Sequence, residues 1–211
     1  MSYSRDSTTS GTGSIQGVAV AIVAENDDPQ QRGRVTLRYP WLETAGESDW
    51  TRIAVPMAGP DRGTYFVPEV GDEVLVAFEN GDIDYPYVVG SLWNGDDEPP
   101  TDAPDPDNDI RQIRSRSGHE LTFADGSGEE GVTLETAAGH TIELDDDGET
   151  VTVEDTGGNR IEFDGAAREL SISSDASISI EAPSIQISTT GNLDIEAGGV
   201  LTLDGALITL N

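Results

Sequence analysis

The sequence of 211 residues holds two histidines, and they occupy equivalent positions in a repeated motif. His119 and His140 each follow a glycine, and Asn159 takes the same place in the next repeat. If three copies of the chain assembled around a threefold axis, equivalent imidazoles near that axis could together bind a metal ion. The alternative is a turn position, because Asn and His both tolerate left-handed backbone conformations. We favour the turn and predict no metal-binding residue.

A run of three aspartates at residues 145–147 precedes Gly148. Clustered carboxylate oxygens are the ligands that Ca²⁺ prefers. The run matches neither the spacing of an EF-hand loop nor the glycine-rich nonapeptide of calcium-binding β-rolls. We therefore interpret residues 145–148 as a solvated acidic hairpin turn.

Catalytic chemistry finds little support in the residue types present. The chain has no cysteine, so a thiolate nucleophile is excluded, and no lysine is available for a phosphate-binding loop. Paired carboxylates could serve a glycosidase, but 41 acidic residues make chance pairs inevitable. We predict a protein that is not an enzyme, with no catalytic residue and no cofactor.

Exposed aromatic residues in a basic groove would favour single-stranded nucleic acid. Trp41, Trp50, Tyr65 and Phe66 supply the aromatic part, but their neighbours are acidic and the net charge is −30. Such a charge repels phosphates. We predict no nucleic-acid partner and assign the aromatic residues to packing or to contacts with another protein.

The net charge of −30 needs an explanation of its own. Self-repulsion of this size destabilises a small protein in dilute buffer, whereas at molar salt the Debye length falls to ~3 Å. Carboxylates spread along a chain without lysine are typical of adaptation to a salt-saturated cytoplasm, a halophilic source. The alternative is an acidic, calcium-binding surface protein.

The elements that would position any site are strands. Residues 1–14 are rich in Ser, Thr and Gly and predict a flexible arm. Residues 15–95 carry five or six short apolar runs separated by turn residues, which predicts a small closed barrel. Residues 96–109 hold four prolines and seven acidic residues and predict an extended linker.

Beyond the linker, pairs of apolar residues at i and i+2 recur to the last residue. Each pair predicts one short strand with its apolar side chains on one face. The steps between pairs run from 9 to 11 over residues 110–169 and shorten to 7 or 8 over residues 170–211. The longer steps predict a neck of antiparallel strands, and the shorter ones predict a needle.

A step of 7 or 8 residues holds one strand and a tight turn, which a single chain cannot wrap around a core. Three chains that each supply faces of a triangular prism would cover the apolar rows, so we predict a homotrimer with an intertwined β-helical needle. The predicted core of the needle comprises Ile172, Ile178, Ile180, Ile185, Ile187, Leu193, Ile195, Leu201, Leu203, Ile208 and Leu210.

Three motifs in the first part of the chain carry a family resemblance. Residues 33–41 read GRVTLRYPW, residues 62–78 read RGTYFVPEVGDEVLVAF, and residues 85–94 read YPYVVGSLWN. Together they resemble the OB-fold domain of the central spikes of contractile tails: phage baseplate assembly protein V, the T4-type spike and the spike part of VgrG proteins. The repeats after residue 110 resemble the trimeric β-helical needle of that family.

The resemblance implies a structural spike that trimerises below a hub and pierces an envelope when the sheath contracts. Its OB-fold motif falls on Arg62, Gly63, Phe66, Pro68, Gly71 and Asp72. Neither a hub-type domain nor a lysozyme domain is recognisable, so a separate hub protein is expected. The sequence after residue 140 lacks the His-x-His motif of iron-binding tips.

The resemblance also implies a partner at the tip of the needle. An apolar end is similar to those capped by a separate PAAR-like tip protein, which would dock on Leu207, Ile208, Leu210 and Asn211. Such a spike assembles in the cytoplasm on the tail tube and baseplate, then acts at the target envelope as part of a particle. The alternative function is a secreted or surface β-solenoid adhesin or calcium-binding module.

Overall fold

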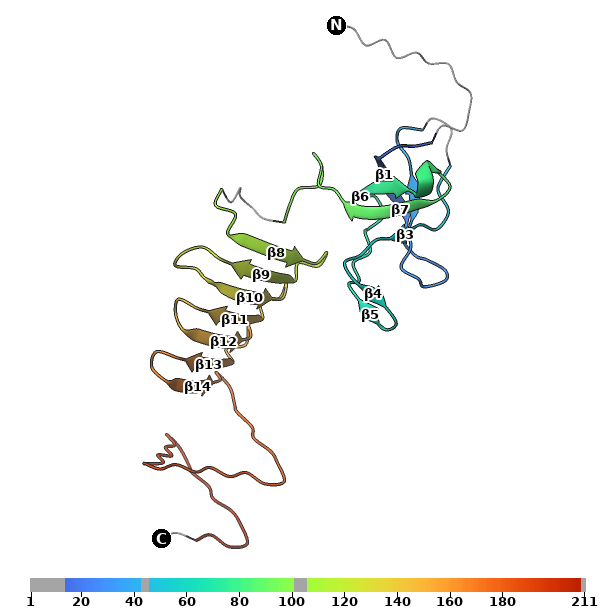
Figure 1. Ribbon diagram of the computed structural model, residues 1–211. Coiled ribbons are helices and arrows are strands. Elements are labelled where there is room, and N and C mark those ends of the chain that lie inside the picture. The colour runs from blue at the N-terminus through green and yellow to red at the C-terminus, as the bar shows by residue number, and fades with distance from the viewer. Residues whose placement is uncertain (1–13, 43–45, 101–105, 210–211) are drawn as a thin grey trace. The chain divides into compact units, whose positions relative to one another are not determined.

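The structure is a computed structural model that describes residues 14–42, 46–100 and 106–209. Two compact units, Met1–Pro104 and Asp105–Asn211, divide the chain. Among the described residues, the regular elements are strands apart from one 3-10 turn, η1, at Glu79–Gly81 (Figure 1), which agrees with the predicted all-β fold class. Within the described ranges, no helix is long and apolar enough to cross a membrane.

The first unit contains a barrel of five short strands that pair in the order β2-β1-β6-β7-β3. An antiparallel bridge between Val35 and Thr51 joins the segments that lead into β2 and β3. Strands β3 and β7 run parallel, and the other pairs are antiparallel. A five-stranded barrel of this topology is an OB fold. The strands are β1 (Val18–Glu25), β2 (Thr36–Arg38), β3 (Arg52–Ile53), β6 (Glu73–Phe78) and β7 (Pro86–Ser91).

Alternating side chains of these strands fill the barrel. In β6 every second residue is buried, which is the pattern of a strand with one face toward a core. Tyr39 packs against Trp41 and Phe78, with ring centroids 5.5 and 5.9 Å apart, and closes one part of that core. The buried apolar residues are Ala21, Val23, Val35, Leu37, Tyr39, Val74, Val76, Phe78 and Val88.

A hairpin of two short strands, β4 (Ala58–Gly59) and β5 (Arg62–Gly63), lies between β3 and β6 in the chain. Gly63 has a φ of +148°, and a Cβ atom there would lie 2.6 Å from the carbonyl oxygen of Met57. That oxygen already accepts a hydrogen bond from the backbone N–H of Thr64. No side chain fits at this position without moving the backbone.

Gly63→Ala is therefore expected to destabilise the barrel by about 2 kcal/mol, the typical cost of strained backbone. All three tryptophans of the chain lie at positions 41, 50 and 93, so thermal unfolding followed by tryptophan fluorescence reports on the first unit alone. Gly90→Ala is the control, because the added Cβ would meet no atom within 4 Å. Equal melting temperatures for the two variants would contradict this account of Gly63.

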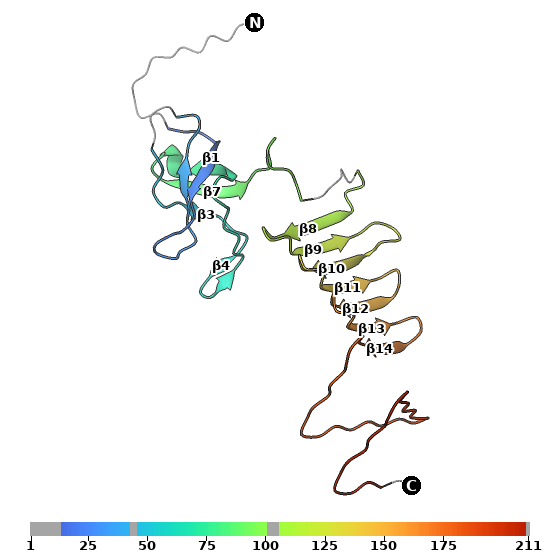
Figure 2. The same cartoon turned by 180° about the vertical axis from the view of Figure 1, so that it is seen from behind.

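The second unit contains seven strands that pair in chain order, each antiparallel to the next. Figures 1 and 2 show them as successive rungs joined by turns at alternating edges. The strands are β8 (Ile110–Arg114), β9 (Glu120–Ala124), β10 (Gly131–Glu135), β11 (Thr141–Asp145), β12 (Thr150–Glu154), β13 (Arg160–Asp164) and β14 (Glu169–Ser173).

Three hairpin turns at one edge of this sheet have the same backbone conformation. Each is a three-residue loop whose last residue is a glycine of positive φ: Gly118, Gly139 or Gly158. This is the hairpin loop in which a left-handed residue follows a type I turn. His119 and His140 lie at the ends of these turns, and the left-handed conformation that they could tolerate is taken by the preceding glycine in each case.

The three aspartates at 145–147 lie at the opposite edge, in the turn between β11 and β12. The Asp145 carboxylate accepts the N–H of Gly148 at 2.8 Å, and the Asp147 carboxylate accepts the N–H of Glu130 at 3.0 Å. Side-chain acceptors for backbone N–H groups are typical of turns. In the part of the chain that the structure describes, no cluster of three His, Asp or Glu side chains could hold a metal ion.

Residues 174–209 follow β14 as extended chain without strand pairing to the rest of the molecule. Every residue from 175 to 209 is exposed in the single chain, including the isoleucines and leucines. An isolated copy thus leaves the predicted needle without a core.

Candidate functional site

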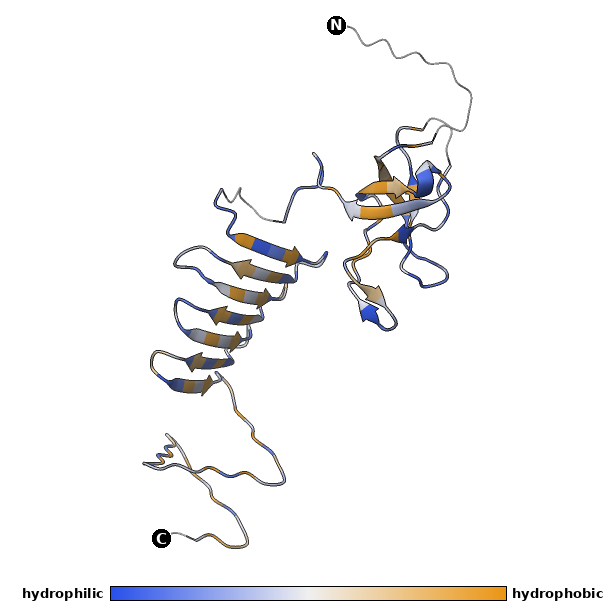
Figure 3. Cartoon of the chain, viewed as in Figure 1, coloured by the Kyte–Doolittle hydropathy of each residue, from blue (hydrophilic) through white to orange (hydrophobic). Residues whose placement is uncertain are grey.

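One face of the seven-stranded sheet is apolar and uncovered. The strand register places two rows of side chains on this face, and hydropathy alternates along each strand (Figure 3). The most exposed apolar residue on this face is Ile172, at 57%, and Val151, at 38%, is among the less exposed ones. One row contains Ile113, Leu121, Leu134, Ile142, Val153, Ile161 and Ile172, and the other contains Phe123, Val132, Leu144, Val151, Phe163 and Leu170.

The first of these rows borders a groove of about 500 Å³. Ile142, Ile161 and Ile172 line it, and Ile178 from the segment after β14 lines it too. Ser174 Oγ donates to the side-chain oxygen of Asn159 at 2.6 Å, which holds the start of that segment against the sheet edge. The apolar groove therefore runs from the sheet into the residues predicted for the needle.

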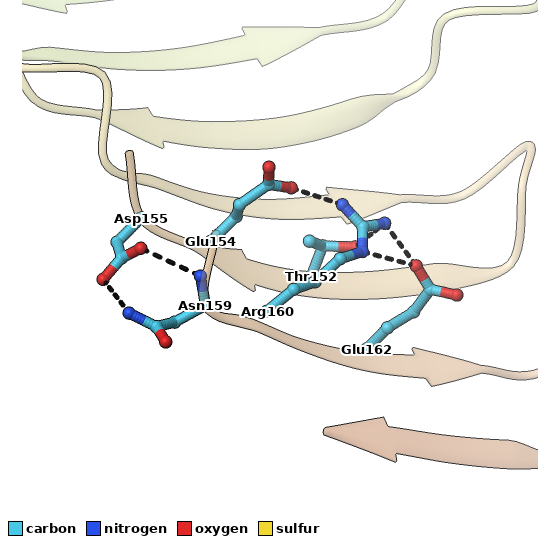
Figure 4. A network of polar contacts seen from close by, with 6 residues as sticks. All are labelled: Thr152, Glu154, Asp155, Asn159, Arg160 and Glu162. Atoms are coloured by element: carbon cyan, nitrogen blue, oxygen red, sulfur yellow. Dashed lines mark hydrogen bonds and ion pairs between the residues drawn. The ribbon is translucent and has the colours of Figure 1, made fainter. Parts of the chain in front are cut away.

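The opposite face of the sheet is polar and carries its own partners. Figure 4 shows Arg160 donating to Glu154, to Glu162 and to the hydroxyl of Thr152. Thr152 is buried, with 2% of its surface exposed. Opposite charges across neighbouring strands stabilise a sheet modestly when the pairs are solvated. Farther along this face, Gln112 Oε1 is buried without a hydrogen-bond partner among the described residues.

A second polar cluster in Figure 4 closes the loop at the sheet edge. The Asp155 carboxylate accepts the backbone N–H and the side-chain amide of Asn159 at 3.1 and 2.8 Å. It also accepts the backbone N–H of Gly157, which the figure does not draw, at 2.7 Å. These hydrogen bonds, the Asn159 side chain first, lower the pKa of Asp155. At Asn159, the position equivalent to His119 and His140, the side chain thus takes part in closing the turn.

The structure does not bring the predicted needle core together within one chain. Ile172 lies in β14 on the apolar face, and the described members beyond it lie along the extended segment. These side chains range from 49% exposed at Ile208 to 74% at Ile180. Leu207, which was predicted for the docking surface at the tip, is more exposed than any of these residues. Leu210 and Asn211, predicted for the core end and the tip, lie outside the described residues.

The predicted OB-fold motif divides into a turn and an exposed patch. Pro68, Gly71 and Asp72 form the turn before β6: the Gly71 N–H donates to the Val23 carbonyl, and the Asp72 carboxylate accepts the N–H of Glu69. Arg62 and Gly63 form β5. Phe66 is exposed and borders a groove beside the β4–β5 hairpin.

One structural residue of the barrel carried no signal in the sequence. Asp28 is buried, and its carboxylate accepts two hydrogen bonds from the Arg34 guanidinium at 2.8 and 2.7 Å. It also accepts the backbone N–H groups of Gln30 and Arg32. The Arg34 hydrogen bonds hold the pKa of Asp28 far below its usual range. One aspartate among 41 acidic residues cannot be singled out by type or spacing.

The fold and the uncovered face define a class: an all-β protein in which an OB barrel precedes a β-unit with an uncovered apolar face. Residues 19–93 match the type VI secretion system/phage-baseplate injector OB domain, and residues 112–211 match the phage baseplate V C-terminal trimerisation domain. The chain belongs to this family of baseplate and type VI spike proteins. The recognition made from the sequence motifs is confirmed.

Curated relatives are similar to parts of the chain. The type VI secretion system spike protein VgrG3 of Vibrio cholerae is 32% identical over 110 residues, 48% of this chain and 11% of the relative. The spike protein VgrG1b of Pseudomonas aeruginosa is 26% identical over 148 residues, 63% of this chain and 20% of the relative. The actin cross-linking toxin VgrG1 of Vibrio cholerae is 30% identical over 112 residues, 49% of this chain and 10% of the relative. The chain thus spans between a tenth and a fifth of the length of these proteins.

Proposed function

We propose that three copies of this chain form the structural, non-enzymatic central spike of a contractile injection system or phage-type tail. The observation that carries the proposal is the uncovered apolar face of β8–β14, which continues into the exposed isoleucines and leucines of residues 174–209. Exposed apolar surfaces of this extent mark interaction sites. The match of residues 112–211 to a trimerisation domain supports a second and third copy as the partner.

In this arrangement the apolar faces of three sheets turn toward a common axis and the polar faces, with Arg160 and its carboxylates, turn toward water. The extended segments of three chains pair with one another, so each supplies the backbone hydrogen bonds and the apolar cover that the others lack. Intertwined chains cannot unfold one at a time, which suits a needle that carries axial load.

The mechanism is mechanical. Sheath contraction drives the tube and spike into the target envelope, and the narrow needle concentrates the force on a small area. The barrel docks on the threefold hub at the end of the tail tube. We propose the hub as a separate polypeptide, with assembly in the cytoplasm before the particle acts at the target.

A PAAR-like protein at the tip of the needle is part of the same proposal. Leu207 and Ile208 are exposed in the single chain, which supports an apolar docking surface formed together with Leu210 and Asn211. A threefold copy of this surface would present one apolar platform to a single cap.

The first test is the mass of the purified chain by light scattering at molar KCl. We expect three times 22.3 kDa, unchanged by a chelator, because the proposed interface is apolar. High salt screens the repulsion between chains of net charge −30. A monomer at these conditions would overturn the spike proposal, and a trimer that dissociates with chelator would favour a calcium-dependent module instead.

A further inference from the structure

A cavity of about 660 Å³ lies at the barrel surface between two loops. One loop, residues 46–49, precedes β3, and the other, residues 83–86, leads into β7. The lining contains three carboxylates, those of Glu47, Asp49 and Asp84, and no arginine. The cavity is therefore strongly acidic.

Tyr39 is one of the residues that line this cavity, and its buried phenol oxygen has no hydrogen-bond partner among the described residues. Tyr39 is only 5% exposed, and its ring is fixed by Trp41 and Phe78. A buried polar atom left unpaired is costly, and such an atom in a native structure needs a reason. A ligand that supplies the missing partner is such a reason.

Both walls of the cavity are held rigidly. In the first loop, the Ser48 N–H donates to the Leu37 carbonyl at 2.8 Å, and the Ser48 hydroxyl accepts the N–H of Leu37 at 2.9 Å. In the second, the Asp84 N–H donates to the Asp82 carboxylate at 3.1 Å. The Tyr85 N–H donates to the Asp82 carbonyl at 3.1 Å. The acidic groups are thus presented by preorganised backbone, which lowers the entropic cost of binding.

The carboxylates that face the cavity lack cationic partners. Asp49 and Asp84 form no ion pair with any of the residues that the structure describes, and Glu47 accepts only a long hydrogen bond from Thr36. Burial and then the charge of Asp84 raise the pKa of Tyr39 to about 12. The phenol is therefore neutral at physiological pH, and its oxygen can accept a hydrogen bond.

We propose that this cavity binds a guanidinium group. A guanidinium carries five N–H donors in a rigid plane, so it can satisfy a phenol oxygen and separated carboxylates at once. A bare metal ion fits less well, because no three of the described acidic groups are close enough to hold one. The exposed Tyr85 at the rim adds an aromatic ring of the kind on which guanidinium groups stack.

The guanidinium can come from an arginine side chain of another protein or from free arginine. Calorimetric titration of the full chain at moderate ionic strength would use two capped pentapeptides, Gly-Gly-Arg-Gly-Gly and its citrulline counterpart, and free arginine. We expect the arginine peptide to bind. The neutral citrulline peptide should bind at least about tenfold more weakly, or not at all. Tighter binding of the peptide than of arginine would assign the site to a protein side chain, and the reverse would assign it to the amino acid.

Variants separate this site from general charge attraction. Tyr39→Phe and Asp84→Asn are each expected to weaken binding about tenfold or more, because each removes an acceptor for a charged donor. Asp61→Asn, in the turn of the β4–β5 hairpin outside the cavity, is the matched control and should leave the affinity unchanged. Equal binding of the citrulline peptide, or unchanged affinity in either cavity variant, would overturn the proposal.

Tyr39→Phe also gives a readout without any ligand. Since the variant removes a hydroxyl that has no partner, the melting temperature of the barrel is expected to stay the same or to rise. A clear fall in that temperature would show that the hydroxyl is already satisfied within the chain, and the proposal would fail. The site lies within the barrel, so this result does not depend on whether the needle trimerises.

Discussion

Ile187→Asp is expected to abolish assembly of the trimer. In the proposed needle this substitution places three carboxylates together on the threefold axis, where an unpaired charge is very costly to bury. In the single chain Ile187 is 71% exposed, so aspartate costs the monomer nothing. The light-scattering mass should fall from three times 22.3 kDa to 22.3 kDa while the barrel stays folded.

Gln186→Asp is the matched control for this experiment. It adds the same charge one residue away, and successive side chains of an extended strand point to opposite faces. Gln186 would face water in the needle, so the control should remain trimeric. A soluble Ile187→Asp trimer of normal thermal stability would contradict the model of the needle.

The strands of the second unit could be predicted from the alternation of apolar and polar residues in the sequence. Leu121/Phe123 and Ile161/Phe163 are apolar pairs two residues apart, and each forms the apolar face of one strand, as alternation requires. Neighbouring pairs then meet in register, for example Val153 opposite Ile161. Alternation is a local property, and for this reason sequence alone could predict it.

Features that depend on close approach in three dimensions could not be predicted in this way. The conformational strain in the turns falls on Gly139 rather than His140, because the loop type, not the residue's tolerance, decides which position is left-handed. The Asp28–Arg34 pair and the unpaired hydroxyl of Tyr39 depend on burial, and burial of a single polar residue leaves no periodic signal. The proposed needle core depends on other chains altogether.

Asp28→Asn is expected to lower the melting temperature of the barrel by several degrees without changing the mass of the trimer. The substitution leaves the Arg34 guanidinium, whose side chain is 17% exposed, without its counter-ion. Removing one partner of a buried pair is more damaging than never having the pair. Tryptophan fluorescence measures the effect, because all three tryptophans lie in the first unit.

The pH dependence of this effect has a definite sign. The pKa of Asp28 is lower in the folded than in the unfolded chain, because Arg34 and two backbone N–H groups stabilise the carboxylate. The stabilisation is therefore fully present above the unfolded pKa of about 4 and is lost as the pH falls toward the folded value. The difference in melting temperature between the native chain and Asp28→Asn should shrink steadily below about pH 4.

Asp27→Asn provides the comparison, since it removes the same charge from the neighbouring, exposed residue. Acid destabilises every carboxylate-rich protein, so the informative quantity is the difference between the two variants at each pH. If Asp28 acts through its buried ion pair, that difference is largest near neutral pH and persists at molar KCl, because salt screens buried pairs much less than exposed ones. A difference that vanishes with salt, or that grows toward acid pH, would show that the pair does not stabilise the barrel.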